Sequence, residues 1–275
     1  MSDGTGSQQT PRDYFIEGSR AFGTATQSAV RISESRIGVF HTGRQNRVLF
    51  SFTKAITHAL SIELIHSHAT EMRPEVGLLD HFSIGALTRT LIDSCIMTLY
   101  LSEPSLSIAE WDLRRHVLFL HDLTNRRRFL SAMRKHAKQS PPANDDTDYK
   151  QAKNNIASVI RRRATELALP EDRIQELLKG QIVFLDGVRG AIREAELDVD
   201  HFDFMHTYLS NQVHSHPVSY VRAEDQKISL ETPSNFQFSF CGLCLEAGAQ
   251  YLAAMTARVE AFTGDAKRDP NGHIE

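Results

Sequence analysis

An arginine and an aspartate lie four residues apart in one of the most apolar segments of the sequence. Residues at this spacing share one face of an α-helix, so Arg89 and Asp93 are placed to form an ion pair. A buried charge costs free energy unless it is paired, and one interpretation is therefore a structural ion pair that fixes helix packing. The other interpretation is that Arg89 faces a cleft and binds a phosphate or carboxylate, with Asp93 orienting its guanidinium.

A second set of polar residues recurs along residues 199–214. Its members follow one another at intervals of three and four residues and share one helix face: Asp203, His206, Ser210 and His214. Histidine titrates near neutral pH and is the most frequent general acid or base. Asn211 is placed to orient a ring nitrogen or a ligand. A solvated helix face with a histidine at its C-terminal end explains the same pattern without chemistry.

Two short segments resemble the HEPN-like helical families of prokaryotic proteins. The segment Leu87–Asp93 reads LTRTLID, is followed by an aromatic residue at Tyr100, and resembles their Arg-x-x-x-acid helix. The segment Tyr208–His214 reads YLSNQVH and resembles their later helix with a tyrosine, a serine and a terminal histidine. The order and the wide separation of the two segments also fit, and the resemblance covers roughly residues 44–262.

The resemblance implies a helical bundle that acts as a homodimer. Many HEPN-like proteins are metal-independent ribonucleases of toxin or antiviral systems, whereas others only bind a nucleotide or a protein partner. In the ribonucleases an arginine stabilises the charge on the phosphate while a histidine assists attack by the 2′-hydroxyl. The resemblance assigns these roles to Arg89 and His214, with Asp93 and Asn211 as orienting groups, and it implies no cofactor.

The stretch from Arg114 to Arg163 is strongly basic, with thirteen lysine and arginine residues against four aspartates and no glutamate. Such an excess attracts phosphate backbones, which supports RNA as a partner. Its densest parts are two runs of three arginines, and these are the candidate RNA-binding residues: Arg126, Arg127, Arg128, Arg161, Arg162 and Arg163. The alternative is that these charges form ordinary solvated helix faces.

Two acid-x-x-His pairs indicate a third function, a carboxylate/histidine metal enzyme in a helical bundle. Glu63 with His66 forms one pair, and Asp203 with His206 forms the other. Ferritin-like bundles place Glu-x-x-His on two helices and single glutamates on two others. Because an aspartate replaces one glutamate and the chain has thirteen histidines, a chance match competes with this interpretation.

Periodic apolar positions with few intervening glycines and prolines predict an all-α fold. Residues 80–102 are apolar on nearly every side, which is typical of a helix at the centre of a bundle. We predict a HEPN-like helical bundle with additional helices packed beside it. The helices are expected at residues 12–32, 44–72, 80–102, 106–139, 148–168, 171–180, 181–195, 199–214 and 235–262. Residues 227–231 alternate in polarity and predict one short strand or a loop.

Composition and charge bound the remaining expectations. The net charge is −3 and 41% of residues are hydrophobic, as in ordinary globular proteins. No uninterrupted apolar run reaches the ~18–20 residues that cross a bilayer, and the three cysteines suit a reducing compartment. We therefore expect a cytoplasmic protein without membrane contact. Residues 1–11 and 264–275 are predicted tails around one helical domain at 12–263, in which 106–195 form an insertion or extension.

Overall fold

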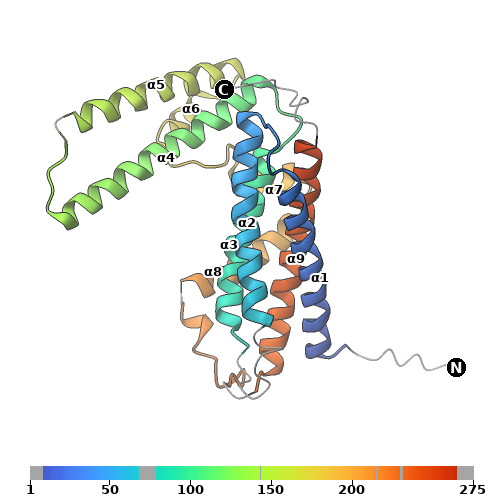
Figure 1. Cartoon of the computed structure of the whole chain (residues 1–275). Coiled ribbons are helices and arrows are strands. Elements are labelled where there is room, and N and C mark those ends of the chain that lie inside the picture. Colours follow the sequence, from blue (N-terminus) through green and yellow to red (C-terminus); the bar gives the residue numbers. More distant parts are fainter. Residues whose placement is uncertain (1–8, 68–78, 143, 215, 230–231, 265–275) are drawn as a thin grey trace. The chain divides into compact units, whose positions relative to one another are not determined.

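A computed structural model describes residues 9–67, 79–142, 144–214, 216–229 and 232–264 of the protein (Figure 1). These residues form nine α-helices, one 3-10 helix and no strand, which confirms the predicted all-α class. The chain divides into two compact units. The first unit combines residues 1–102 with 195–275, and the second is the continuous segment 103–194.

The first unit is a bundle around α3. Its elements are α1 (Pro11–Ser35), α2 (Gly43–Ser67), α3 (His81–Leu101), α8 (Val199–Val213), the 3-10 helix η2 (Pro217–Ser219) and α9 (Asn235–Thr263). The central helix α3 packs against α2, α8 and α9, as its apolar circumference predicts, while α1 packs along α9. The residues around the predicted end of α2, including Pro74, lie outside the described residues. Residues 227–229 form no strand, and 230–231 are also outside the described part.

Buried polar side chains fix the helix ends in this unit. At one end, the Arg44 guanidinium at the start of α2 donates from Nε to the carbonyl of Leu101 at 3.0 Å, and it lies 4.9 Å from the Phe262 ring. At the other end, Gln237 in the first turn of α9 donates from Nε2 to the carbonyl of Leu79 at 3.1 Å. The termini of α2, α3 and α9 are therefore joined by hydrogen bonds as well as by apolar packing.

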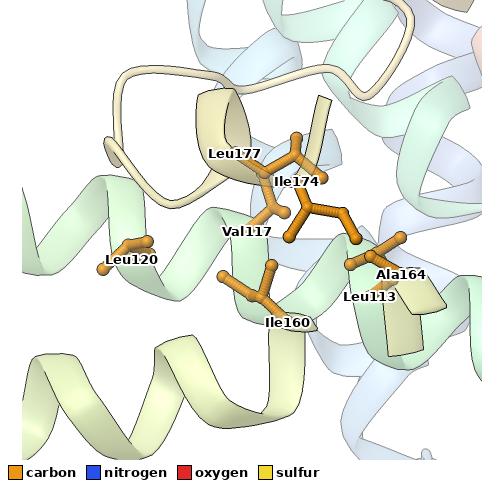
Figure 2. Close-up of a cluster of buried hydrophobic side chains, with 7 residues drawn as sticks. All are labelled: Leu113, Val117, Leu120, Ile160, Ala164, Ile174 and Leu177. Carbon is orange, nitrogen blue, oxygen red and sulfur yellow. The ribbon is translucent and has the colours of Figure 1, made fainter. Parts of the chain in front are cut away.

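The second unit is built on a helical hairpin. Its helices are α4 (Ile108–Ala137), α5 (Asp145–Glu166), α6 (Glu171–Leu177) and α7 (Gly187–Glu194). Figure 2 shows its apolar core, to which α4, α5 and α6 contribute: Leu113, Val117, Leu120, Ile160, Ala164, Ile174 and Leu177. Within the hairpin, the core residues come from the first half of α4 and the last part of α5, and α6 adds Ile174 and Leu177. The remaining parts of the two helices thus extend beyond the core as a two-helix arm.

Two helices, α2 and α3, are long and apolar enough to cross a membrane by length and composition. The core helix of a soluble bundle meets the same criterion. In α3 the most apolar window is 67% buried, as expected for a core helix, whereas in α2 only 33% of that window is buried. Part of the apolar surface of α2 is therefore not used by its own bundle.

Glycines allow α1 and α9 to approach each other closely. A Cβ atom added at Gly248 would lie 2.7 Å from Cε2 of Phe22, whose side chain is fully buried. Real Cβ atoms do not make contacts this short, so an alanine at this position forces the ring or the helix to move. A Cβ atom at Gly23 on α1 would meet only Oε1 of Glu63 at 3.5 Å, which is ordinary van der Waals contact.

We expect Gly248→Ala to lower the free energy of unfolding by about 1–3 kcal/mol, because overpacking a rigid core is destabilising. Gly23→Ala is the matched control. It should raise the free energy of unfolding by roughly 0.5–1 kcal/mol, since alanine loses less backbone entropy than glycine in a helix. Urea unfolding of the two variants tests this. Equal effects of the two substitutions would contradict the close α1–α9 contact.

The start of α3 carries a buried histidine among aromatic rings. The ring of His81 lies 3.9 Å from that of Phe82 and 6.0 Å from those of Phe236 and Phe240, and only 2% of the residue is exposed. Burial lowers its pKa below the usual 6.5, although a hydrogen bond to the backbone at Leu79 and the charge of Asp80 oppose this shift. The folded protein therefore holds His81 uncharged at pH values where the unfolded chain is protonated.

Stability should fall as the pH drops below about 6.5, because the unfolded chain then binds a proton that the folded protein excludes. His81→Leu removes this titration, so the loss of stability between about pH 7.5 and pH 5.5 should be smaller than in the wild type. Urea unfolding at the two pH values measures it. An unchanged loss in the variant would show that His81 does not cause it.

Candidate functional site

The predicted ion pair is present on α3. Nη1 of Arg89 contacts Oδ1 of Asp93, and their side chains are 13% and 50% exposed. The central helix is thus buried as expected, but its ion pair lies at the edge of the bundle rather than in a dry core. Nε of Arg89 is buried and has no hydrogen-bond partner among the described residues, so the guanidinium keeps donor capacity beyond the ion pair.

A histidine from α8 belongs to the same group of charges. His206 is half-buried, and its ring lies 5.1 Å from that of Phe202. Burial is the main cause that lowers its pKa from 6.5, and the positive charge of Arg89 lowers it further, while Asp93 and Asp203 act in the opposite direction. We call Arg89, Asp93, Asp203 and His206 the α3–α8 cluster.

The other two residues that the resemblance marks as catalytic lie further along α8. His214 follows the last residue of the helix and is exposed, with its ring 5.4 Å from that of His216. Asn211 donates to the carbonyl of Thr207 at 2.9 Å, and its Oδ1 lies 3.3 Å from Nδ1 of His216. Eight residues of helix, about 12 Å along the axis, separate His214 from His206.

The catalytic residues implied by the resemblance therefore fall into two groups. Arg89 and Asp93 form an ion pair, whereas Asn211 and His214 both contact His216 at the C-terminal end of α8. No contact within the described part of the chain joins the two groups. Sequence spacing placed His206 in the polar stripe of residues 199–214 and in the alternative metal site, but not with Arg89. Its position beside Arg89 depends on how α8 is rotated on α3, which no short sequence pattern specifies.

The two acid-x-x-His pairs face different helices. Glu63 and His66 lie against α1: the pKa of Glu63 is raised by burial and lowered by a hydrogen bond with Thr26, and the His66 ring is 6.3 Å from that of Phe15. His206 is instead within electrostatic range of the α3 ion pair and of Asp203 on its own helix. Among the residues that the structure describes, no group of three or more His, Cys, Asp or Glu side chains is arranged to hold a metal ion.

Four of the six candidate RNA-binding arginines are paired with carboxylates of the second unit. Arg126 pairs with Asp122, Arg127 with Asp146, Arg161 with Glu171, and Arg163 with Asp112. Arg127 also stacks on the ring of Tyr149 at 4.2 Å. Arg128 and Arg162 are exposed and form no ion pair with any described residue. The basic excess of the sequence is therefore only partly available at the surface.

The α3–α8 cluster combines a proton acceptor with a cation. At neutral pH an imidazole with a lowered pKa is uncharged and accepts a proton, which is the role of a general base. The Arg89 guanidinium, which lies within electrostatic range of it, can bind a phosphate through paired N–H groups. Asp93 is half-exposed, so this edge of α3 is accessible from solvent.

Comparison of the chain with protein-family models, with curated proteins and with solved structures gives no match. The HEPN-like resemblance consequently stays a prediction. The α3–α8 cluster and the exposed arginines of the second unit are the features of the molecule that bear on its function.

We expect NMR titration to find the pKa of His206 below 6.5 in the wild type. Arg89→Met should raise that pKa, because it removes a nearby positive charge, and Asp93→Asn should lower it, because it removes a negative one. Asp122→Asn, which alters an exposed carboxylate on α4, is the control and should leave it unchanged. If the pKa of His206 is the same in the wild type and in both α3 variants, the cluster does not exist in solution.

Proposed function

We propose that this protein is an RNA-directed effector that cleaves RNA without a metal ion at the α3–α8 cluster. The observation that carries the proposal is that α8 packs against α3 with His206, a histidine of lowered pKa, within electrostatic range of the Arg89–Asp93 pair, whose aspartate is half-exposed. Phosphodiester cleavage needs a proton acceptor and a fixed positive charge, and these residues supply both. A role as a toxin or in antiviral defence follows from the HEPN-like resemblance alone, and a location in the cytoplasm follows from the composition of the sequence.

In the proposed reaction, His206 accepts the proton of a ribose 2′-hydroxyl. The 2′-oxygen then forms a bond to the adjacent phosphorus while the bond from phosphorus to the 5′-oxygen breaks. The protonated His206 or water returns a proton to that 5′-oxygen, so the products are a 2′,3′-cyclic phosphate and a 5′-hydroxyl. Arg89 stabilises the charge that develops on the phosphate oxygens, and Asp93 orients its guanidinium.

The second unit supplies exposed positive charge for the RNA backbone. Arg128 and Arg162 have no carboxylate partner among the described residues, so binding a phosphate there breaks no ion pair. The four arginines that are already paired would first have to lose a carboxylate contact. We therefore assign the main backbone contacts to Arg128 and Arg162, with an affinity that falls as salt rises.

A non-catalytic module that binds a nucleotide or a protein is the second candidate. The ion pair itself favours it, because Asp93 already neutralises the guanidinium that a transition state requires. In that case Arg89 exchanges its carboxylate partner for a ligand anion, and no bond in the ligand is broken.

RNA cleavage in excess EDTA distinguishes the candidates. We expect the wild type to cleave, and His206→Gln to lose about 10²–10⁴-fold in rate because its general base is removed. Arg89→Met should lose a comparable factor through lost charge stabilisation. His136→Gln, which changes an exposed histidine on α4, is the matched control and should retain wild-type activity.

Three other outcomes would each lead to a different assignment of the site. Loss of activity in His214→Gln but not in His206→Gln would assign the base to the histidine that the resemblance marks. RNA binding that Arg128→Ala and Arg162→Ala weaken, without cleavage by the folded wild type, would support the binding module. Equal cleavage by all variants would place the activity elsewhere.

A further inference from the structure

The two-helix arm of the second unit carries a groove between α4 and α5. Its volume is about 310 Å³, at the lower end of the range of ~300–1,000 Å³ that small-molecule sites occupy. Four half-buried side chains from the two helices form its apolar lining: Leu123, Leu130, Tyr149 and Ala152. The arm therefore leaves an apolar hollow partly open to solvent, of a size that suits one ring system rather than a large ligand.

One part of the lining is a stacked pair of planar groups. Cζ of Arg127 lies over the ring of Tyr149, 4.2 Å from its centroid, and both residues line the groove. An ion pair with Asp146 holds the Arg127 guanidinium in this position. Unpaired nucleic-acid bases stack on aromatic rings and on the planes of arginine guanidiniums. The pair is thus a preformed stacking surface for a base.

Two polar side chains of the groove are available to a ligand. Asp148 lines it, and the carboxylate forms no hydrogen bond or ion pair with any described residue, whereas Asp145 and Asp146 in the same first turn of α5 are paired with arginines. Arg126 lines it from α4 and pairs with Asp122 in its own helix, where the two side chains are 64% and 62% exposed. Such exposed pairs contribute little to stability, so Arg126 can exchange its partner for a phosphate.

These groups fit guanine better than the other RNA bases. The Watson–Crick edge of guanine presents two neighbouring donors, N1–H and the 2-amino group, and one carboxylate can accept from both at once. Adenine and cytosine each present an amino donor beside an acceptor nitrogen, and uracil presents one N–H between two carbonyls. A carboxylate that has no other partner therefore favours guanine.

We propose that the α4–α5 groove binds an unpaired guanine base together with its phosphate. The base stacks on the Arg127–Tyr149 pair, and its Watson–Crick edge donates to Asp148. The phosphate contacts Arg126. A free guanine nucleotide and a guanine in single-stranded RNA share this chemistry, whereas a guanine in a duplex already uses its Watson–Crick edge and should not bind.

The inference goes beyond the proposed cleavage and does not rest on it. It gives the arm a preference for one base and for single-stranded RNA. None of the groove residues belongs to the α3–α8 cluster, and binding is measured with ligands that cannot be cleaved. A protein that fails to cleave RNA can therefore still bind guanine, and the two proposals fail separately.

Isothermal titration calorimetry of the full chain with the 5′-monophosphates of guanosine, adenosine, cytidine and uridine tests the base preference. We expect GMP to bind most tightly. Asp148→Asn should weaken GMP binding by about 5- to 150-fold, the factor for a good bidentate contact to a base, and should abolish the preference. Asp172→Asn is the matched control and should change nothing, since Asp172 is an exposed aspartate in the first turn of α6 without a partner among the described residues.

Two further substitutions separate stacking from phosphate binding. Tyr149→Leu should weaken GMP binding by about 5- to 150-fold through lost stacking, while Tyr149→Phe, which keeps the ring, should retain it. Arg126→Ala should weaken the binding of GMP but not of guanosine, because the nucleoside has no phosphate. Circular dichroism should show the wild-type helix content in every variant.

Short 2′-O-methyl oligouridines, with and without one central guanine, identify the source of the base. Binding of the guanine-containing strand that is tighter than that of GMP, and that is lost when the strand is paired with its complement, would assign the groove to single-stranded RNA. Binding no tighter than that of GMP would assign it to a free nucleotide. A wild type without a preference for guanine in either form, or a preference that survives Asp148→Asn, would overturn the proposal.

Discussion

The first unit depends on the burial of α3. A helix that is apolar on almost every side needs neighbours around most of its circumference, and α2, α8 and α9 provide them. Gly85 of α3 packs against Gln212 of α8, since a Cβ atom added at Gly85 would lie 3.0 Å from Cγ of Gln212. Arg89 and Asp93 lie one and two helical turns after Gly85 and are within electrostatic range of His206, which precedes Gln212 in α8. Hence α8 runs antiparallel to α3. The apolar packing of α3 therefore determines which residue of α8 meets its ion pair.

The helices α1 and α9 pack closely along their length, whereas α2 uses only part of its apolar surface in the bundle. Helices α1 and α9 run in the same direction: Gly18 faces Gly242, Phe22 faces Gly248, and Arg36 donates to Oγ1 of Thr263 at 2.8 Å near the far end. The helix α2 packs against α1, α3 and α9 with the face that carries its buried residues. The rest of its apolar surface is left exposed.

Sequence patterns predicted the local structure and one contact of the candidate site. The helical segments, the central position of α3 and the pairing of Arg89 with Asp93 follow from spacing within a single helix, which sequence specifies directly. The meeting of His206 with that pair could not be predicted, because it depends on the rotation of α8 about its axis. Likewise, the exposure of Phe50 depends on where the other helices pack, since its sequence context is as apolar as that of the buried Phe52.

In the basic stretch from Arg114 to Arg163, the positive charge counted in the sequence also differs from the positive charge available at the surface. The carboxylates that neutralise Arg127 and Arg134 come from the first turn of α5, where Asp145 accepts two hydrogen bonds from Arg134 at 2.7 and 2.8 Å. Beyond the apolar core of the second unit, such pairs and the contact of Arg127 with Tyr149 join α4 to α5. Most of these arginines therefore have a structural task. Charge counted along the sequence overstates the charge offered to a phosphate backbone, and any RNA contact must rely on the few arginines that the arm does not use.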